Sequence, residues 1–325
     1  MSNIEEVIEQ APKNNEIIKS FLVADNKLKG CKKAVCSISG GADSDIVLDL
    51  LTKIDSEHKI TYVFFDTGLE YEATKKHLDK LKAKYGIEIY TAKAVKPIPV
   101  CCHEHGVPFL SKYVSERISR LQRHGFKWED KPFTELLEMY PKCESSLKWW
   151  CNGFGEKSRF NISYNKWLKE FLIENPPSMP ISNKCCHYAK KLVAANYKKQ
   201  GGYDLDITGI RKSEGGIRSA AYKNCFTPAK DNTIDEFRPI FWYTTETKKE
   251  YDGFYGVEHS DCYEIWGLPR TGCAGCPYAK DFERELEAVM KNEPKMYKAL
   301  IKVFGASYEY IRKYREFQKK MNGKG

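Results

Sequence analysis

Short apolar runs alternate with helix-like segments in the first third of the chain, and this alternation restricts the fold more than any other feature. Apolar runs occupy 34–38, 60–65 and 87–90, with helical patterns at 44–51 and 71–85 between them. Strands separated by helices of about ten residues or more predict βαβ units and a parallel sheet. Ligands of such sheets bind at the carboxyl ends of the strands.

The same pattern returns after a long interruption. A helical pattern near 186–199 precedes a strand at 205–208 and an extended stretch at 238–242, and the remainder is helical, as are the first 28 residues. Periodicity blurs between the two parts, where tryptophans are scattered among charged residues, and this indicates a mostly helical insertion. The predicted division is an N-terminal helical segment 1–30, a core of 31–96 and 181–278, an insertion 97–180 and a C-terminal helical region 279–325.

Composition places the chain among ordinary globular proteins. Hydrophobic residues make up 42% and charged residues 30% of the 325 residues. No apolar stretch approaches the length of about 18 residues that a membrane span requires, and the N-terminus is polar and acidic, so we expect a cytoplasmic protein without a membrane partner. The net charge of +9 favours a phosphate-rich partner such as a nucleotide or a nucleic acid, although solubility alone also explains it.

A glycine-rich loop lies where the first strand ends and a helix begins. Paired glycines let the backbone approach a ligand closely, and the free N–H groups at the start of the helix attract an anion. The candidate phosphate-binding residues are Ser37, Ser39, Gly40, Gly41, Asp43 and Ser44. An ordinary glycine-rich turn between strand and helix is the alternative.

The string SGGADS resembles the SGGxDS loop of PP-loop ATP pyrophosphatases. The chain has no Gly-Lys-Ser or Gly-Lys-Thr, so the loop differs from that of NTPases that cleave at the γ-phosphate. The resemblance implies a Rossmann-like α/β core of the adenine nucleotide α-hydrolase type. It further implies that the loop binds ATP with Mg²⁺, that Asp43 is catalytic, and that the α-phosphate is attacked.

Two further elements resemble the phosphoadenosine-phosphosulfate (PAPS) reductase superfamily. The second strand ends in Asp66, Thr67 and Gly68, which resembles the DTG element of sulfonucleotide reductases; helix capping by Asp66 is the alternative. The segment 208–218 looks like the family's GxRxxES loop, with Gly215 where a serine is common. Its nucleotide-binding candidates are Gly209, Arg211 and Arg218, and Arg211 is also a catalytic candidate, because arginine suits bidentate phosphate contacts. A basic surface loop is the alternative reading.

The cysteines form two close pairs with metal-binding character. Cys185 and Cys186 are adjacent, and Cys273 and Cys276 form a C-x-x-C; zinc and iron–sulfur clusters both accept such sulfur ligands. The arrangement resembles that of adenylyl-sulfate reductases, which implies a 4Fe-4S cluster on these four residues, with zinc as the alternative. A weaker candidate is Cys101-Cys102 with the neighbouring histidines, and with Cys143 and Cys151; burial in the core is its alternative.

Function follows from what the resemblance keeps and what it lacks. Sulfonucleotide reductases attack with a C-terminal cysteine, and this sequence has none after Cys276. We therefore expect an AMP-forming ATP pyrophosphatase, a sulfurtransferase that adenylates DNA or tRNA and replaces oxygen with sulfur obtained from a donor such as a cysteine desulfurase. The alternatives are a sulfonucleotide reductase with an atypical thiol, and a noncatalytic nucleotide-binding iron–sulfur subunit.

Overall fold

The computed structural model describes residues 4–214, 221–231 and 233–323. The chain forms two compact units, and it passes from one to the other and back. The first unit comprises residues 1–95 and 189–274, and the second comprises 96–188 and 275–325. The second unit therefore joins the whole of the predicted insertion, 97–180, to the C-terminal helices.

The first unit contains a six-stranded sheet with the order β3-β2-β1-β4-β6-β5. Its strands are β1 Ala34–Ser37, β2 Ile60–Asp66, β3 Ile89–Lys93, β4 Leu205–Ile207, β5 Phe226–Thr227 and β6 Asp235–Phe237. Only β5 pairs antiparallel. The predicted α/β class with a parallel sheet is confirmed. Because β1 is flanked by β2 and β4, the strand order reverses beside it, and this is where ligands of open α/β sheets bind.

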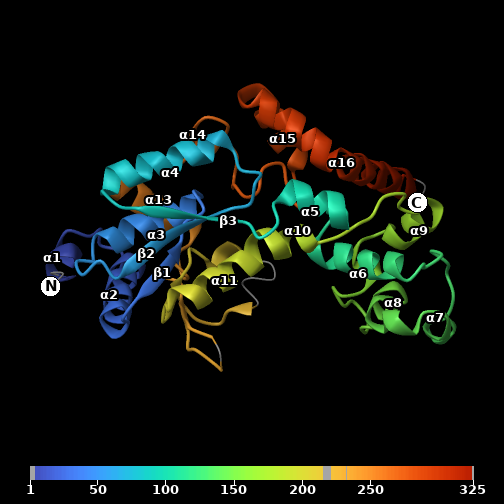
Figure 1. Ribbon diagram of the computed structural model, residues 1–325, viewed down its shortest axis with the longest axis horizontal. Helices are drawn as coiled ribbons and strands as arrows, with labels where there is room; N and C mark the ends of the chain where they lie inside the picture. Colours follow the sequence, from blue (N-terminus) through green and yellow to red (C-terminus); the bar gives the residue numbers. More distant parts are fainter. Residues whose placement is uncertain (1–3, 215–220, 232, 324–325) are drawn as a thin grey trace. The chain divides into compact units, whose positions relative to one another are not determined.

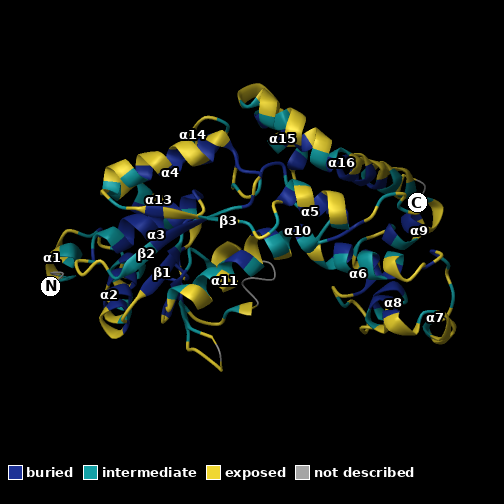
Figure 2. Cartoon of the chain, viewed as in Figure 1, coloured by how far each residue is buried: buried dark blue, intermediate teal, exposed yellow. Residues whose placement is uncertain are grey.

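Helices cover both faces of this sheet (Figure 1). The first unit contains α1 Ile4–Glu9, α2 Asn15–Gly30, α3 Ala42–Thr52, α4 Glu72–Tyr85, α11 Leu192–Gly201, α13 Thr245–Tyr255 and α14 Asp261–Glu264. Side chains alternate along β1: Ala34 and Cys36 join the large core with α2 and α3, while Val35 packs in a smaller cluster with Tyr203. Figure 2 shows the resulting burial of β1 and α3.

The second unit is helical. Its helices are α5 Ile98–His105, α6 Lys112–Arg123, α7 Phe133–Met139, α8 Glu144–Trp150, α9 Leu168–Glu174, α10 Lys184–Cys186, α15 Phe282–Asn292 and α16 Pro294–Asn322. Trp149 and Trp150 are fully buried, and Trp128 packs edge-on against Trp150. These three tryptophans therefore belong to the core of this unit.

Two sequence expectations are wrong. The first 28 residues are not one helix, because α1 and α2 are separated at Pro12, and Asn14 caps α2 with its side chain. The stretch 238–242 is a turn rather than a strand: Pro239 follows β6, and Phe241 N donates to Arg238 O.

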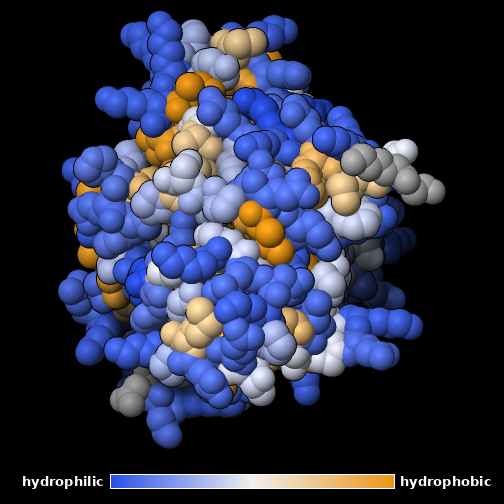
Figure 3. Space-filling view, turned by 90° about the vertical axis from the view of Figure 1, so that its right-hand side faces the viewer, coloured by the Kyte–Doolittle hydropathy of each residue, from blue (hydrophilic) through white to orange (hydrophobic). Residues whose placement is uncertain are grey.

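Within the described residues, none of the helices combines the length and the apolar character that a membrane span requires. One face of the molecule is mostly hydrophilic, with small separate hydrophobic patches (Figure 3).

Candidate functional site

The glycine-rich loop 37–44 of the first unit, called the phosphate loop after its predicted role, curls around the hydroxyl of Ser44. The backbone N–H groups of Ser39 and Gly41 donate to Ser44 Oγ at 3.3 Å and 3.2 Å, and Ser44 Oγ donates to Gly41 O at 2.7 Å. The amides on either side of Gly40 therefore point to one spot, now filled by the Ser44 hydroxyl, and amides that converge in this way suit an anion. The predicted loop residues are therefore together at the end of β1, with Ser37 as the last residue of that strand.

Glycine is required at two places around this loop. Gly40 has a φ of +65°, and a Cβ there would lie 2.7 Å from Thr74 Cγ2. A Cβ on Gly209 would lie 3.0 Å from the backbone oxygen of Asp43. The predicted Gly209 segment therefore lies directly against the phosphate loop. Arg218 lies outside the described residues.

Two cations converge on Asp43 at the start of α3. Arg211 Nε lies 2.9 Å and Lys248 Nζ 3.1 Å from the same carboxylate oxygen. The Arg211 guanidinium also donates to Ser213 Oγ at 2.8 Å, and the Arg211 backbone N–H donates to Glu214 Oε1 at 3.0 Å. The arrangement gives a fixed patch of positive charge beside the loop. Sequence reasoning found Asp43 and Arg211 but missed Lys248, which is one of the two lysines on α13 and carries no local motif.

Tyr263 and Thr271 also reach the loop. The Tyr263 hydroxyl accepts hydrogen bonds from the N–H groups of Ala42 and Thr271, the latter at 3.0 Å. Burial raises the pKa of this phenol, which therefore stays protonated at neutral pH. A hydroxyl bonded to the first amide of α3 lies where a ligand of that helix end would bind. Both residues come from a segment that contains no recognisable nucleotide-binding motif.

Asp66, Thr67 and Gly68 form a turn that is satisfied internally. Asp66 Oδ1 accepts from Gly68 N at 2.8 Å, and Thr67 is fully buried with its hydroxyl donating to Glu70 at 2.5 Å. Burial raises the pKa of Glu70, although the bond from Thr67 opposes this shift. The Thr67 side chain thus shapes the turn at the carboxyl end of β2. Contact of these residues with a nucleotide stays a prediction.

A buried charge network lies under the loop. Asp45 Oδ2 lies 3.0 Å from both His77 Nε2 and His259 Nδ1, and His259 Nε2 lies 3.3 Å from Asp252. Asp45 is fully buried. Burial lowers the pKa of His259, but the hydrogen bonds and charges of Asp252 and Asp45 outweigh it and raise the pKa to about 9. The imidazolium therefore neutralises Asp45 at the first turn of α3.

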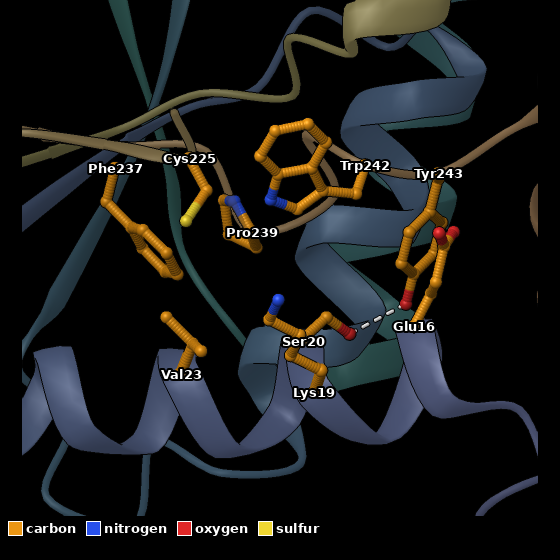
Figure 4. A pocket seen from close by; sticks show the side chains of 9 residues that line it. All are labelled: Glu16, Lys19, Ser20, Val23, Cys225, Phe237, Pro239, Trp242 and Tyr243. Atoms are coloured by element: carbon orange, nitrogen blue, oxygen red, sulfur yellow. Dashed lines mark hydrogen bonds between the residues drawn. The ribbon is translucent and has the colours of Figure 1, made fainter. Parts of the chain in front are cut away.

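A cavity of about 310 Å³ lies between α2 and the turn after β6. Figure 4 shows the rings of Trp242 and Phe237 on one side and α2 on the other, with the Ser20 and Tyr243 hydroxyls bonded at 2.7 Å. None of the described residues predicted to bind a nucleotide lines this cavity. The Tyr243 backbone oxygen nevertheless accepts hydrogen bonds from the Ser213 hydroxyl and the Arg211 guanidinium. A residue that lines this cavity therefore helps to position Arg211.

The predicted metal ligands divide between the two units. Cys185, Cys186 and Cys276 belong to the second unit and Cys273 to the first. The pKa of Cys185 is raised. The hydrogen bond with Cys102 and burial both raise it, and the hydrogen bond with Cys186 opposes them. Soft thiol donors suit iron–sulfur clusters and zinc. In the part of the chain that is described, however, no three or more His, Cys, Asp or Glu side chains are arranged to hold a metal ion.

The second unit has a cavity of its own, of about 540 Å³. Its lining combines cationic side chains, Arg123 and Lys184, with His105, the aromatic residues Phe126 and Trp128, and the segment 177–182. Burial lowers the pKa of His105, and the nearby lysines act in the same direction. Lys184 directly precedes Cys185, so this cavity and the thiols share one segment of chain.

The first unit thus belongs to the class of open α/β sheets with a phosphate-type loop at the point where the strand order reverses. Residues 33–109 match the family model of the phosphoadenosine phosphosulfate reductase domain. The matched segment contains the SGGADS loop and the DTG turn. This match confirms the predicted resemblance to that family for this part of the chain. The search of curated proteins found no significant match.

Solved structures with a partly similar fold include three enzymes. A PAPS reductase from Candida auris in a phosphate complex has a TM-score of 0.45 and 14% identity, covering 83% of this chain and 93% of the other. The U34-tRNA thiolase NcsA from Methanococcus maripaludis with its [4Fe-4S] cluster has a TM-score of 0.36 and 12% identity, covering 92% and 80%. An NH₃-dependent NAD synthetase from Campylobacter jejuni has a TM-score of 0.38 and 13% identity, covering 96% and 95%. At these scores the likenesses carry no argument about the site.

Proposed function

We propose that this protein is an ATP pyrophosphatase that activates an acceptor by adenylation for sulfur transfer. The observation that carries the proposal is the convergence of Arg211 and Lys248 on Asp43, beside a loop whose amides point to one spot. A triphosphate needs several positive charges and N–H donors held close together. This edge of the sheet offers both.

The loop amides and the two cations would hold the triphosphate, and an acceptor oxygen would attack the α-phosphorus. The bond between the α-phosphorus and the bridging oxygen breaks, pyrophosphate leaves with the electron pair, and the acceptor loses its proton to solvent. Mg²⁺ would neutralise further phosphate charge, and Asp43 is the carboxylate that residues 37–44 would offer it. The adenylated acceptor is then open to replacement of oxygen by sulfur, with AMP as the leaving group.

The sulfur chemistry of the proposal depends on a cluster. Cys185, Cys186, Cys273 and Cys276 are its proposed ligands, with zinc as the alternative metal, and a bound 4Fe-4S cluster would supply thiolate-ligated iron for sulfur transfer. A donor such as a cysteine desulfurase would provide the sulfur. The net charge of +9 supports DNA or tRNA as the acceptor, as does the cavity of the second unit, whose lining places Arg123 and Lys184 against a single carboxylate, Glu104.

A sulfonucleotide reductase is the second candidate, because residues 33–109 match the PAPS reductase domain. That reaction would release sulfite from an adenylyl sulfate and would need a thiol nucleophile. The two functions thus differ in their products.

One anaerobic experiment separates them. The purified protein is incubated with ATP and, separately, with adenylyl sulfate and its 3′-phosphorylated form, with DNA or tRNA present, and pyrophosphate, AMP and sulfite are measured. Pyrophosphate and AMP from ATP support the proposal. Sulfite release supports the reductase instead. ATP binding with neither product contradicts both and leaves a noncatalytic nucleotide-binding subunit.

A further inference from the structure

The cavity of about 310 Å³ in the first unit, between α2 and the turn 238–243 after β6, has no role in the proposed function. A dry cavity of about 150 Å³ is large enough to bind benzene, so this one has room for a molecule of two fused rings. Close-packed interiors contain few voids of this size, and small-molecule sites begin at about 300 Å³. The volume is thus that of a ligand site.

Both walls of the cavity are fixed by contacts within the protein. The other face of α2 is buried in the core of the sheet, and in the turn Tyr243 N donates to Ile240 O at 3.0 Å. Ser20 Oγ lies 2.7 Å from Tyr243 Oη and joins the two walls. The Thr247 hydroxyl of α13 donates to Glu16 Oε2 at 3.3 Å and ties α2 a second time. The space is therefore pre-formed, and a ligand loses little affinity to ordering its walls.

Apolar rings make up one wall of the cavity. Figure 4 shows Trp242, Pro239 and Phe237 around the space, with Val23 of α2 facing them. Phe237 and Pro239 are buried, whereas Trp242 is 37% exposed and so lies at the opening. Rings of this kind gain most from contact with another flat ring. The wall therefore favours an aromatic ligand.

The Ser20–Tyr243 pair supplies a hydrogen-bond acceptor. Ser20 Oγ donates to Ile17 O at 2.7 Å, and a hydroxyl has a single hydrogen, so the Tyr243 hydroxyl is the donor in its bond to Ser20. Burial raises the pKa of Tyr243, so the phenol keeps this proton at neutral pH. The Tyr243 oxygen retains a lone pair, to which none of the described residues donates. An N–H or O–H of a ligand would complete it.

The charges at the cavity do not favour an ionic ligand. Glu16 and Lys19 lie three residues apart on α2 and both line the cavity, so their opposite charges largely cancel there. An ion placed against the apolar wall would lose hydration without a matching partner. A neutral ligand avoids this cost.

We propose that this cavity binds a small neutral aromatic molecule that carries an N–H or O–H group. Its rings lie against Trp242 and Phe237, and its N–H or O–H donates to Tyr243 Oη. Indoles and phenols belong to this class.

The occupied cavity acts on the phosphate loop through Tyr243. The Tyr243 backbone oxygen accepts from Ser213 Oγ at 2.8 Å and from the Arg211 guanidinium at 3.4 Å, and Arg211 in turn contacts Asp43. A ligand that holds Tyr243 in place therefore favours the position of Arg211 beside the loop. This coupling, unlike the binding itself, rests on the proposed function, and it predicts stronger ATP binding when the cavity is occupied.

The first test uses indole as the probe, titrated by calorimetry into the full chain without ATP. We expect saturable binding. Val23→Phe fills the cavity from α2 and should abolish binding, whereas Leu22→Phe, the matched control at a position that is 47% exposed and does not line the cavity, should preserve it. Absence of saturable binding to the wild type, or equal binding by the two variants, would overturn the proposal.

The second test examines the hydrogen bond and does not depend on filling the cavity. 1-Methylindole has the same rings but no N–H, so the wild type should bind indole more tightly by about two- to tenfold, the range of one net hydrogen bond. Tyr243→Phe removes the acceptor but keeps the backbone oxygen, and it should bind the two probes equally. A preference that persists in Tyr243→Phe, or that the wild type lacks, contradicts the proposed class of ligand.

ATP affinity is then measured with and without saturating indole. We expect indole to strengthen ATP binding in the wild type and in Leu22→Phe but not in Val23→Phe. Indole binding without any change in ATP affinity overturns the coupling to Arg211. A protein that binds indole but not ATP contradicts the proposed function and supports the cavity as a ligand site, so the two failures are distinguishable.

Discussion

The phosphate loop of the first unit takes its donors from one run of residues, 37–44, whereas the thiols of the second unit come from three segments far apart in sequence. The loop amides point inward because two glycines and Ser44 shape a short turn between β1 and α3. The segments that carry these thiols are tied to one another where Val107 pairs with Ile181 and where the Tyr278 hydroxyl donates to Ser182 O. A local site can be identified from a motif, while an assembled site depends on contacts that a motif does not contain.

The largest expected effect concerns the local site. Gly41→Val places a branched side chain where even a Cβ would lie 3.2 Å from Ser39 Oγ and from Tyr263 Oη, and we expect ATP binding to fall below detection by calorimetry. Gly30→Val is the matched control, because a Cβ there meets nothing within 4 Å. Metal content should be unchanged in both variants. Unchanged ATP affinity in Gly41→Val would mean that the loop does not bind phosphate.

Lys248 tests how far the local site depends on distant residues. Lys248→Ala removes one of the two cations on Asp43, and loss of a charge-assisted contact of about 1.5–3 kcal/mol predicts ATP binding weaker by about ten- to a hundredfold. The neighbouring Lys249, which is exposed, provides the control Lys249→Ala. Equal ATP affinities of Lys248→Ala and Lys249→Ala would show that Lys248 pairs with Asp43 but does not contribute to ATP binding.

The network under the loop predicts a pH dependence of stability. The folded pKa of His259 is raised to about 9 from 6.5, so its stabilising contribution is complete below about pH 6.5 and is lost as the pH rises through 9. The full shift corresponds to a contribution of about 3 kcal/mol to the free energy of unfolding. Urea unfolding from pH 6 to 10 should show this loss in the wild type but not in His259→Gln. The exposed His124 supplies the control His124→Gln, which should follow the wild type.

The smallest effect is expected at the cavity of the second unit. Arg123→Glu reverses one exposed charge of its lining, and if tRNA or DNA binds there, affinity should fall several-fold and the salt dependence of log K should weaken by about one unit. Binding titrations at two salt concentrations measure both quantities. Lys142→Glu, an exposed charge reversal that does not line this cavity, should have less effect. Equal losses in the two variants would indicate a response to net charge alone.

The sequence by itself determined the parallel α/β core and the glycine-rich turn between β1 and α3. Alternating apolar runs specify strands and helices locally, and two glycines before a helix specify a tight turn, for which anion binding stays a prediction. The same local reasoning failed at 238–242, where apolar residues resembled a strand but Pro239 ends the ladder in a turn.

Tertiary structure alone decided which distant side chains join each site. Lys248 of α13 and Tyr263 of α14 reach the start of α3, where Lys248 Nζ lies 3.1 Å from Asp43 and the Tyr263 hydroxyl lies against Gly41. In the second unit, the pairing of Val107 with Ile181 ties the end of α5 to the segment before α10. No spacing in the sequence encodes these meetings, because side-chain proximity between remote segments depends on the packing of whole helices. The physical reason is that a motif specifies only the backbone of its own few residues, whereas a binding site is a sum of contacts across the fold.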